Sequence, residues 1–522
     1  MNLANWLHQT GLVRPGAPAL RSGTQLHATY AEFAFRSSAI GRWLGARHGI
    51  GKGDRVAIFT RNCPEYLEIL YGVLWIGAAV VPINHKLHPR EADWILRNAE
   101  AKLVLTGTGA VFSDDLPSPC HEIAINGAEL VQAVACAQPD SYRPPVPAED
   151  GALAWLFYTS GTTGRPKGVI LTHHNLRMMA TTYALDVDPV LPQDHSLYAA
   201  PMSHGAGLYN FQFVRAGACH VIPESRGFDP TEIQALGEAL GNLVFFAAPT
   251  MVKRLVSHAA RAGFSGEGIR TIIYGGGPMY TADLEEALRV LGPKFAQIYG
   301  QGESPMTITA MSRAMVGADD HPNAASRRAS VGIAQSCVEV RVVDAQMQEA
   351  ATGEVGEVVV RGDTVMAGYW RNPEATAAAV VDGWLKTGDL GRFDADGFLT
   401  LTDRSKDVII SGGTNIYPRE VEEALLTHPQ VFEASVIGQP HPEWGEEVVA
   451  FIVQTGEDLA TADLDDWCKA QIASFKKPKR YVFVLELPKN SYGKVLKTSL
   501  RAQLADGQPA GLASGVNDDE RV

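Results

Sequence analysis

The 522-residue sequence has little cysteine, and what it has is scattered. None of its six cysteines stands in the close pairs that zinc sites use, and their number is far below that of small disulfide-bonded scaffolds. A disulfide framework and a cysteine-based zinc site are therefore excluded as the basis of the fold. We expect reduced, buried thiols at Cys63, Cys120, Cys136, Cys219, Cys337 and Cys468.

Long hydrophobic runs are also missing. The longest nearly apolar stretch, residues 73–83, contains Gly77 and Pro82 and is far shorter than the roughly 20 residues that a membrane-spanning helix needs. The N-terminal sequence MNLANWLHQTG has neither a basic start nor a continuous apolar segment, so a secretory signal is not expected. The sequence therefore predicts no membrane span and a cytoplasmic location.

Positive charge is in deficit, because 45 Lys and Arg against 58 Asp and Glu give a formal net charge of -13. A protein whose main partner is DNA or RNA needs clustered Lys and Arg to meet the phosphate backbone. Nucleic acid is therefore excluded as the main partner, although small anions can still bind at local sites. With 46% hydrophobic and 20% charged residues, the composition is that of a globular protein with a sizeable core.

Strand-like and helix-like segments alternate along the chain. Arg55–Thr60 is strand-like, residues 64–77 have helical spacing of apolar residues, and residues 79–83 are strand-like again. The alternation recurs over residues 244–299, which predicts an α/β fold with a largely parallel sheet. Short strands over about 331–402 predict a small β-subdomain, and residues 405–522 predict a small α+β domain whose tail, after about residue 502, is disordered. The large N-terminal domain is then predicted over residues 1–404.

The strongest local signal is YTSGTTGRPKGV at residues 158–169, directly after an apolar, strand-like run. Glycines let the backbone approach an anion closely, hydroxyl side chains add donors, and Lys167 adds charge. A Walker-type loop is the alternative, but it needs Ser or Thr after its lysine at the start of a helix, whereas Gly168 follows Lys167. We therefore predict a different phosphate-binding loop, formed by Thr159, Ser160, Gly161, Thr162, Thr163, Gly164 and Lys167.

Further motifs follow in order along the chain: PMSHGAG at 201–207, GGGPM at 275–279, YGQGE at 299–303, TGDL at 387–390, DRSKD at 403–407, SGGTNIYPREVE at 411–422 and NSYGK at 490–494. Together with the loop at 158–169, this series resembles the signatures of the ANL superfamily of adenylate-forming enzymes, which contains acyl-CoA synthetases, adenylation domains of peptide synthetases and firefly luciferase. The motifs span residues 158–494, and the β-α-β pattern before them is compatible with the same fold. The resemblance implies that the C-terminal domain is mobile and rotates between two half-reactions.

The resemblance also implies residue roles. Glu303 would hold Mg²⁺, and Lys494 would bridge the substrate carboxylate and the α-phosphate of ATP. His204 would border the acyl pocket, and it is not needed as a general base because the acid is already ionised near neutral pH. Lys406 would be the hinge. The remaining nucleotide- and CoA-binding positions would be Gly275, Gly276, Gly277, Gln297, Tyr299, Gly300, Gln301, Gly302, Asp389, Arg404, Gly412 and Gly413.

One position departs from the family pattern. Family members usually carry Thr where this chain has Gly302, and that hydroxyl contacts the α-phosphate. We expect Ser304 or a water molecule to take over this contact. Restoring the hydroxyl with Gly302→Thr should be neutral or favourable, provided that the turn tolerates a side chain.

These features predict an ATP-dependent carboxylic acid:CoA ligase that uses ATP, Mg²⁺ and coenzyme A and forms an acyl-adenylate. Two alternatives stay open: a ligase that loads the acid onto the phosphopantetheine arm of a carrier protein, and a non-catalytic nucleotide-binding protein. The second is disfavoured because Lys494, Glu303 and Asp389 are all present. A homodimer is compatible with the sequence.

The acid itself is indicated only by apolar residues that fall near the implied acyl pocket. They favour an apolar medium-chain or aromatic acid, and they fit core packing equally well. These residues are Tyr209, Phe211, Phe213, Phe246 and Met279.

Overall fold

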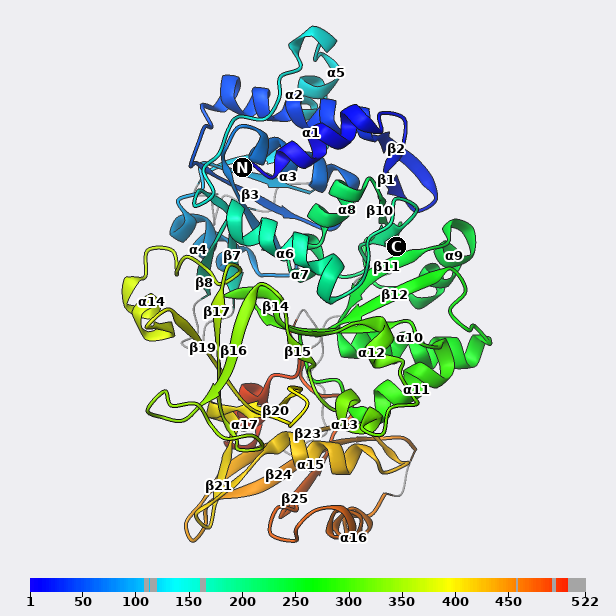
Figure 1. The fold of residues 1–522 in the computed structure, drawn as a ribbon, viewed down its shortest axis with the longest axis vertical. Helices are drawn as coiled ribbons and strands as arrows, with labels where there is room; N and C mark the ends of the chain where they lie inside the picture. Colours follow the sequence, from blue (N-terminus) through cyan, green and yellow to red (C-terminus); the bar gives the residue numbers. More distant parts are fainter. Residues whose placement is uncertain (108–111, 113–119, 160–165, 457–458, 491–493, 506–522) are drawn as a thin grey trace.

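The structure is a computed structural model that describes residues 1–107, 112, 120–159, 166–456, 459–490 and 494–505. Its described strands form four sheets. Two large α/β sheets occupy the upper part of Figure 1, an antiparallel sheet lies below them on the left, and the C-terminal sheet forms the lower end. The α/β fold class with a parallel-rich N-terminal part and a small C-terminal part is confirmed.

The largest sheet has nine strands, of which the six from β13 to β1 are parallel and the outer three are antiparallel. In sheet order these are β15 (Ile333–Ala334), β14 (Ser304–Met311), β13 (Phe295–Gln301), β12 (Ile269–Tyr274), β11 (Leu243–Ala247), β9 (His195–Leu197), β10 (Cys219–Ile222), β1 (Pro18–Ser22) and β2 (Gln25–Thr29). The central strands are short, almost wholly buried apolar runs, as strands covered on both faces must be. Their carboxyl ends lead into the GGGPM and YGQGE motifs.

The second sheet has six strands: β6 (His121–Ala124), β5 (Leu103–Thr106), β3 (Arg55–Thr60), β4 (Ala79–Asn84), β7 (Leu153–Thr159) and β8 (Lys167–Thr172). All neighbours are parallel except β7 and β8, which pair antiparallel. The predicted phosphate loop therefore connects two adjacent antiparallel strands at one edge of this sheet. Within that loop, Ser160, Gly161, Thr162, Thr163 and Gly164 lie outside the described residues.

Two five-stranded sheets follow. The first contains β16 (Val338–Val343), β17 (Gly356–Gly362), β18 (Val380–Val381), β19 (Trp384–Phe393) and β20 (Leu399–Arg404), and every pair in it is antiparallel. The C-terminal sheet contains β21 (Ile409–Ser411), β22 (Thr414–Ile416), β23 (Val431–His441), β24 (Gly445–Gln454) and β25 (Arg480–Phe483). The C-terminal sheet has its own hydrophobic core, against which α15 and α16 pack.

Helices cover the sheets, and their ends follow ordinary capping rules. For example, Thr29 forms a capping box with Glu32 at the start of α2, and Gly49 ends that helix in the left-handed conformation. None of the described helices is long and apolar enough to cross a membrane. The α-helices are α1 (Ala4–Val13), α2 (Tyr30–His48), α3 (Pro64–Trp75), α4 (Pro89–Ala99), α5 (Ala128–Ala135), α6 (His173–Asp186), α7 (Gly205–Leu208), α8 (Asn210–Ala216), α9 (Pro230–Leu240), α10 (Pro249–Ala262), α11 (Thr281–Leu291), α12 (Arg313–Val316), α13 (Ala324–Arg328), α14 (Pro373–Ala379), α15 (Pro418–Leu426), α16 (Thr461–Gln471) and α17 (Lys497–Ala505); η1 (Pro139–Ser141) and η2 (Ser405–Asp407) are 3₁₀ turns.

The cysteines are all free thiols. The expectation that they are buried is wrong for Cys136, which is exposed just beyond the end of α5, and only partly met by Cys120. The four buried thiols are Cys63, Cys219, Cys337 and Cys468.

Candidate active site

The predicted phosphate loop is held between two strands that a third segment reinforces. Thr159 at the end of β7 and Lys167 at the start of β8 are partners in register, so the loop begins and ends at one point. Residues 367–370 run along the other side of β8, where Ile170 N donates to Gly368 O at 2.9 Å and Trp370 N donates to Gly168 O at 2.7 Å. The two strands at the ends of the loop are therefore held by a third paired segment and do not form an isolated hairpin.

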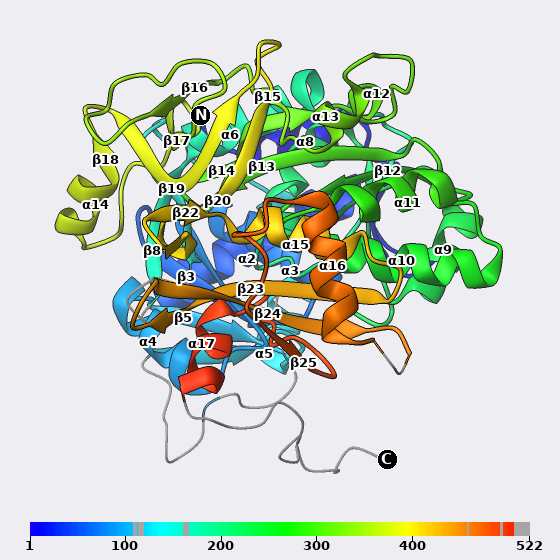
Figure 2. The same cartoon turned by 90° about the horizontal axis from the view of Figure 1, so that it is seen from below.

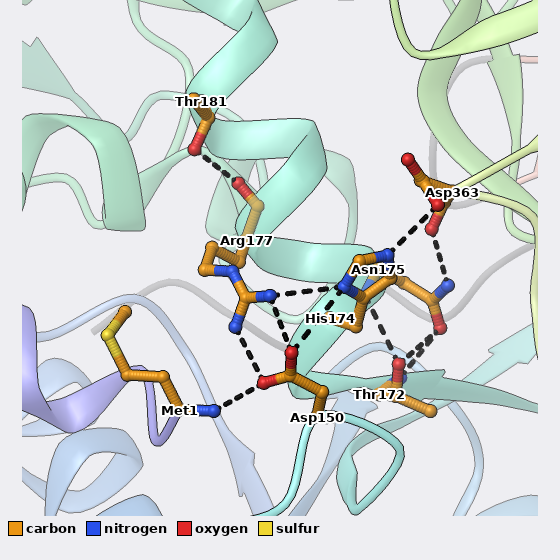
Figure 3. Close-up of polar contacts among 8 residues, drawn as sticks. All are labelled: Met1, Asp150, Thr172, His174, Asn175, Arg177, Thr181 and Asp363. Atoms are coloured by element: carbon orange, nitrogen blue, oxygen red, sulfur yellow. Dashed lines mark hydrogen bonds and ion pairs between the residues drawn. The ribbon is translucent and has the colours of Figure 1, made fainter.

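The helix that follows this base ties it to the antiparallel sheet (Figure 3). Thr172 and Asn175 form a capping box at the start of α6, and the Asn175 amide nitrogen donates to Asp363 O at 2.7 Å and Val365 O at 3.0 Å. His174 Nε2 also lies 3.0 Å from Asp363 Oδ1. Because Asn175 caps the helix and holds the 363–365 backbone with one side chain, β8 and the segment leading to residue 370 form one unit.

Glu303 stands at the turn between β13 and β14, next to that same segment. Its Oε1 accepts a 2.7 Å hydrogen bond from Tyr369 Oη, and its backbone carbonyl accepts from Met366 N at 2.8 Å. Lys167 Nζ lies 5.0 Å from the centre of the Tyr369 ring. No cation pairs with Glu303 among the described residues, so the carboxylate is oriented by Tyr369 and is a suitable hard oxygen ligand for Mg²⁺.

Tyr369 is a functional candidate that the sequence reasoning missed. It lies in the sequence GYW at residues 368–370. This segment does not directly follow a strand and contains no usual catalytic residue type, so nothing in the sequence singled it out. Only the pairing of this segment with β8 brings the ring between Lys167 and Glu303.

Asp389 on β19 is the centre of a second polar group. Its Oδ2 accepts from Tyr299 Oη at 2.7 Å and from Gln301 Nε2 at 2.6 Å, and its Oδ1 lies 3.1 Å from Arg404 Nε. Burial raises the pKa of Tyr299, and the Asp389 carboxylate raises it further. The YGQGE, TGDL and DRSKD motifs therefore meet at one buried carboxylate.

Gln297 and the GGGPM segment lie beside this group, at the carboxyl ends of neighbouring strands. Gln297 is buried on β13, and its Oε1 has no hydrogen-bond partner among the described residues. Such an acceptor is suited to an adenine amino group. Of the three glycines at 275–277, Gly275 must lack a side chain, because a Cβ there would lie 2.6 Å from Ile298 O.

Gly302 is packed too closely for a side chain. A Cβ at this position would lie 2.5 Å from Thr159 Cγ2 and 3.0 Å from Phe157 Cδ1. The expectation that Gly302→Thr is neutral or favourable therefore needs Thr159 to move first. The expectation that Ser304 supplies the hydroxyl of the family's threonine is also wrong, because Ser304 is fully buried, 3.3 Å from Thr307 Oγ1 and 3.4 Å from Thr364 Oγ1.

His204 borders the same space from the opposite side. Its ring lies 4.8 Å from that of Phe157, the residue that also faces Gly302. Burial lowers the pKa of His204 to about 4, so its imidazole is neutral and a weak base near neutral pH. This agrees with a side chain that lines a pocket rather than one that removes a proton.

Not all of the aromatic residues assigned to the acyl pocket belong there. Phe211 packs against Tyr71 with ring centres 6.0 Å apart, and Phe213 packs against Tyr183 at 6.1 Å. Both phenylalanines are fully buried core residues. Tyr209, Phe246 and Met279 are the ones that remain candidates; Tyr209 and Phe246 pack edge to face with ring centres 6.4 Å apart.

Lys494 enters the site from the C-terminal region. It keeps contact with solvent, yet crowding by protein lowers its pKa to about 8, with loss of water as the main cause and Arg404 as the next. Asp389 acts in the opposite direction, and Lys406 lowers the pKa further. The structure thus brings the lysine of the NSYGK motif into electrostatic contact with the group centred on Asp389.

The orientation of the C-terminal part is fixed by contacts with α10 and α11. Tyr280 Oη donates to Glu422 Oε2 at 3.0 Å, and Thr281 N donates to Glu423 Oε2 at 3.3 Å. Lys253 Nζ donates to Phe432 O at 2.6 Å. These are contacts of a docked domain, and they hold Lys494 at the nucleotide site.

The predicted hinge lies beside the Lys494 group, since Lys406 and Asp407 both act on the pKa of Lys494, and the predicted CoA-binding glycines are on the turn that follows. Lys406 is exposed on η2, whereas Asp407 beside it is buried and bonded to Arg501 Nη2 at 2.9 Å. Gly412 and Gly413 form the turn between β21 and β22, where Gly412 N donates to Trp444 O. Among the described residues, none of the site's hydrogen bonds or ion pairs involves these two glycines.

A predicted phosphate loop between β7 and β8, a carboxylate shared by three motifs and a lysine from the C-terminal part are the features expected of an adenylate-forming enzyme. The chain belongs to the AMP-binding enzyme family, whose sequence model matches residues 7–370, and the model of the AMP-binding enzyme C-terminal domain matches residues 420–494. It is 34% identical to a feruloyl-CoA synthase of Amycolatopsis sp over 506 residues, which cover 96% of this chain and 98% of the relative. It is also 34% identical to the fatty acid–[acyl-carrier-protein] ligase ScoC of Streptomyces coeruleorubidus, covering 91% of each.

Solved structures give the same assignment. The o-succinylbenzoate CoA synthetase MenE of Bacillus subtilis, in complex with its acyl-adenylate intermediate, superposes with a TM-score of 0.84 at 31% sequence identity. The match covers 97% of this chain and 99% of that structure.

Proposed function

We propose that this protein is a carboxylic acid:CoA ligase that forms AMP and acts on an apolar medium-chain or aromatic acid in the cytoplasm. The observation that carries the proposal is the electrostatic influence of Asp389 and Arg404 on Lys494, which the C-terminal domain model matches, together with the Asp389–Tyr299 hydrogen bond at 2.7 Å. A nucleotide sensor has no need for a lysine delivered by a second domain, whereas adenylation does. The relatives supply the acid class, since they are named for feruloyl, fatty acyl and o-succinylbenzoyl substrates.

In the first half-reaction, a carboxylate oxygen of the acid attacks the α-phosphorus of ATP, and the bond to pyrophosphate breaks. Lys494 offsets the repulsion between the two anions and the charge that builds on the α-phosphoryl oxygens. We propose that Asp389 accepts from the ribose hydroxyls and that Gln297 Oε1, which has no hydrogen-bond partner among the described residues, accepts from the adenine amino group. Mg²⁺ held by Glu303 would neutralise the charge of the phosphates, and Tyr369 orients that carboxylate.

In the second half-reaction, the CoA sulfur attacks the acyl carbonyl carbon, the thiol proton passes to solvent, and AMP leaves with the electron pair of the broken anhydride bond. For this step we propose that the C-terminal domain turns about Lys406 and presents Gly412 and Gly413 to the pantetheine arm. Both glycines have positive φ, 58° and 77°, in an exposed turn that leaves room for a narrow chain. Lys476 and Lys477 do not support a CoA phosphate site, because they already pair with Glu420 and Asp465.

A carrier-protein ligase is the second candidate, supported by the likeness to ScoC. One experiment separates the two. Pyrophosphate release is measured with ATP and a panel of hydroxycinnamic, medium-chain and short dicarboxylic acids, first alone, then with CoA and then with a carrier protein bearing its phosphopantetheine arm. Thioester formation on free CoA with an aromatic or medium-chain acid is expected. Thioester on the carrier alone would replace the proposal with the second candidate, and no pyrophosphate release with any acid would refute both.

A further inference from the structure

A second cluster of ligand-type side chains lies far from the nucleotide site. His48 is the last residue of α2, His121 is the first residue of β6, and Glu129 is in the first turn of α5. One ligand atom from each of the three lies within 4.8 Å of the others. We propose that these three side chains form a binding site for a zinc ion. Figure 1 shows α2 and α5 at the top of the molecule, at the opposite end from the C-terminal domain.

The spacing of the cluster matches zinc coordination. His48 Nε2 lies 3.2 Å from Glu129 Oε1. In a tetrahedral zinc site, bonds of 2.0–2.1 Å place neighbouring ligand atoms about 3.3 Å apart. The remaining separations are at most 4.8 Å, so His121 and Glu129, which are both exposed, would turn toward the ion to complete the site. Two imidazoles and one carboxylate leave the fourth position of the tetrahedron for water.

His48 and Glu129 form a close pair that does not meet regular hydrogen-bond geometry. His48 Nε2 is buried, and among the described residues no acceptor meets that geometry, although Glu129 Oε1 lies 3.2 Å away. Two ligand atoms at this separation can both point at a common ion, and a buried ring nitrogen without a regular hydrogen bond is a group that such an ion would satisfy.

The His48 ring is held in place. Trp43 packs edge to face against it, with ring centres 4.6 Å apart and planes at 75°. The ring also ends a helix, where the backbone carbonyls favour positive charge.

Arg47 is the one neighbouring charge that opposes a cation. Its Nε lies 3.8 Å from Glu129 Oε1, and its side chain is 74% exposed. The guanidinium therefore competes with a metal ion for the same carboxylate, but it is free to turn into solvent. Removing Arg47 should therefore increase the affinity for the ion if Glu129 is a ligand.

A bound ion would join three elements that the backbone leaves only loosely connected. β6 is the edge strand of the six-stranded sheet and pairs only with β5, while α5 packs against α2. Zinc would fix this edge to the end of α2. Since none of the three ligands lies in the candidate active site, the role is structural and the reaction does not depend on it.

The test uses the full-length enzyme, stripped with a chelator and assayed without nucleotide so that no Mg²⁺-ATP site contributes. Zn²⁺ is titrated against a chromophoric indicator, and Co²⁺ is titrated while visible absorption is recorded. We expect one equivalent to bind, intense absorption typical of tetrahedral cobalt, and a metal-dependent rise in Tm. His121→Gln and Glu129→Gln should each abolish these signals while leaving the metal-free Tm and pyrophosphate release unchanged. His258→Gln, a histidine on α10 bonded to Gln234, is the matched control and should behave as the wild type.

Arg47→Gln should bind Zn²⁺ more tightly than the wild type. The proposal is overturned if the wild type binds no Zn²⁺, or if the single equivalent survives in the His121→Gln/Glu129→Gln double variant. It is equally overturned if Arg47→Gln weakens binding, because Glu129 would then not be a ligand.

Discussion

Gly302 allows the packing of the nucleotide site to be tested one atom at a time. Replacing it with alanine adds a Cβ at 2.5 Å from Thr159 Cγ2 and 3.0 Å from Phe157 Cδ1. A relaxed contact between carbon atoms is about 3.5–4.0 Å, so the Thr159 methyl must move by about 1 Å. Overpacking of this kind costs about 1–3 kcal/mol. If that free energy is lost from the ATP-bound geometry, adenylation slows about 5- to 160-fold.

Thr159→Ser provides the compensating change, because it keeps the hydroxyl and removes the methyl that would collide. We expect Gly302→Ala to cost much less activity in the Thr159→Ser background than it costs in the wild type. The coupling free energy in this cycle should be about 0.5–3 kcal/mol, the range for residues in direct contact. In the same Thr159→Ser background, Gly302→Thr should then show whether the added hydroxyl lowers KM for ATP.

The assay is acid-dependent pyrophosphate release at saturating acid over a range of ATP concentrations, with Tm measured on each variant to confirm folding. Thr159→Val is the matched control, since it keeps the colliding methyl and should give no rescue of Gly302→Ala. Full activity of Gly302→Ala with Thr159 unchanged would refute the packing argument, as would a double variant whose losses are simply the product of the single losses.

Four further results are expected. Glu303→Gln should sharply reduce adenylation at limiting Mg²⁺ without lowering Tm, and an unchanged rate would refute Glu303 as the Mg²⁺ ligand. Tyr369→Phe should reduce adenylation less, and excess Mg²⁺ should restore the rate. Lys494→Ala should lose pyrophosphate release but keep thioester formation from preformed acyl-AMP and CoA, whereas Lys406→Pro should do the reverse because proline fixes the hinge; loss of both activities in both folded variants would contradict a rotating domain. The pKa of Lys494 is lowered to about 8, and its charged form is needed, so kcat/KM for ATP should fall as pH rises through about 8. The residual pyrophosphate release of Lys494→Ala should lack that alkaline limb, and a limb that persists in this variant belongs to another group.

The elements that could be predicted from the sequence are those with strong local periodicity. The strand and helix alternation expected over residues 244–299 includes β12 (Ile269–Tyr274) and α11 (Thr281–Leu291) in the structure. Both segments are short apolar patterns that end in glycine-rich turns, so their boundaries are encoded locally. The motifs at 299–303 and 387–390 singled out Tyr299 and Asp389 separately, and the 2.7 Å hydrogen bond between them is a contact that the structure adds.

Contacts between distant segments that carry no recognisable signature could not be predicted from the sequence. Tyr369 reaches Glu303 because residues 367–370 pair with β8, roughly 200 residues earlier, and neither segment's composition indicates the other. The same holds for Ser304, whose position beside Gly302 in the sequence suggested a substitute hydroxyl. Every residue of β14 is buried, and Ser304 lies beside Thr364 instead.

β1, the first strand of the chain, belongs to a sheet of which most strands are synthesised much later. β1 pairs in parallel with β10, Leu20 opposite His220, so its partner is synthesised 200 residues later. At roughly 5–20 residues per second, the ribosome takes about 10–40 s to supply it. During that interval the backbone groups of β1 that face β10 have no strand to pair with, and the β1–β2 hairpin must stay soluble without its sheet. Translation speed between residues 22 and 219 is therefore a determinant of yield, and a chaperone that binds nascent chains has its first task here.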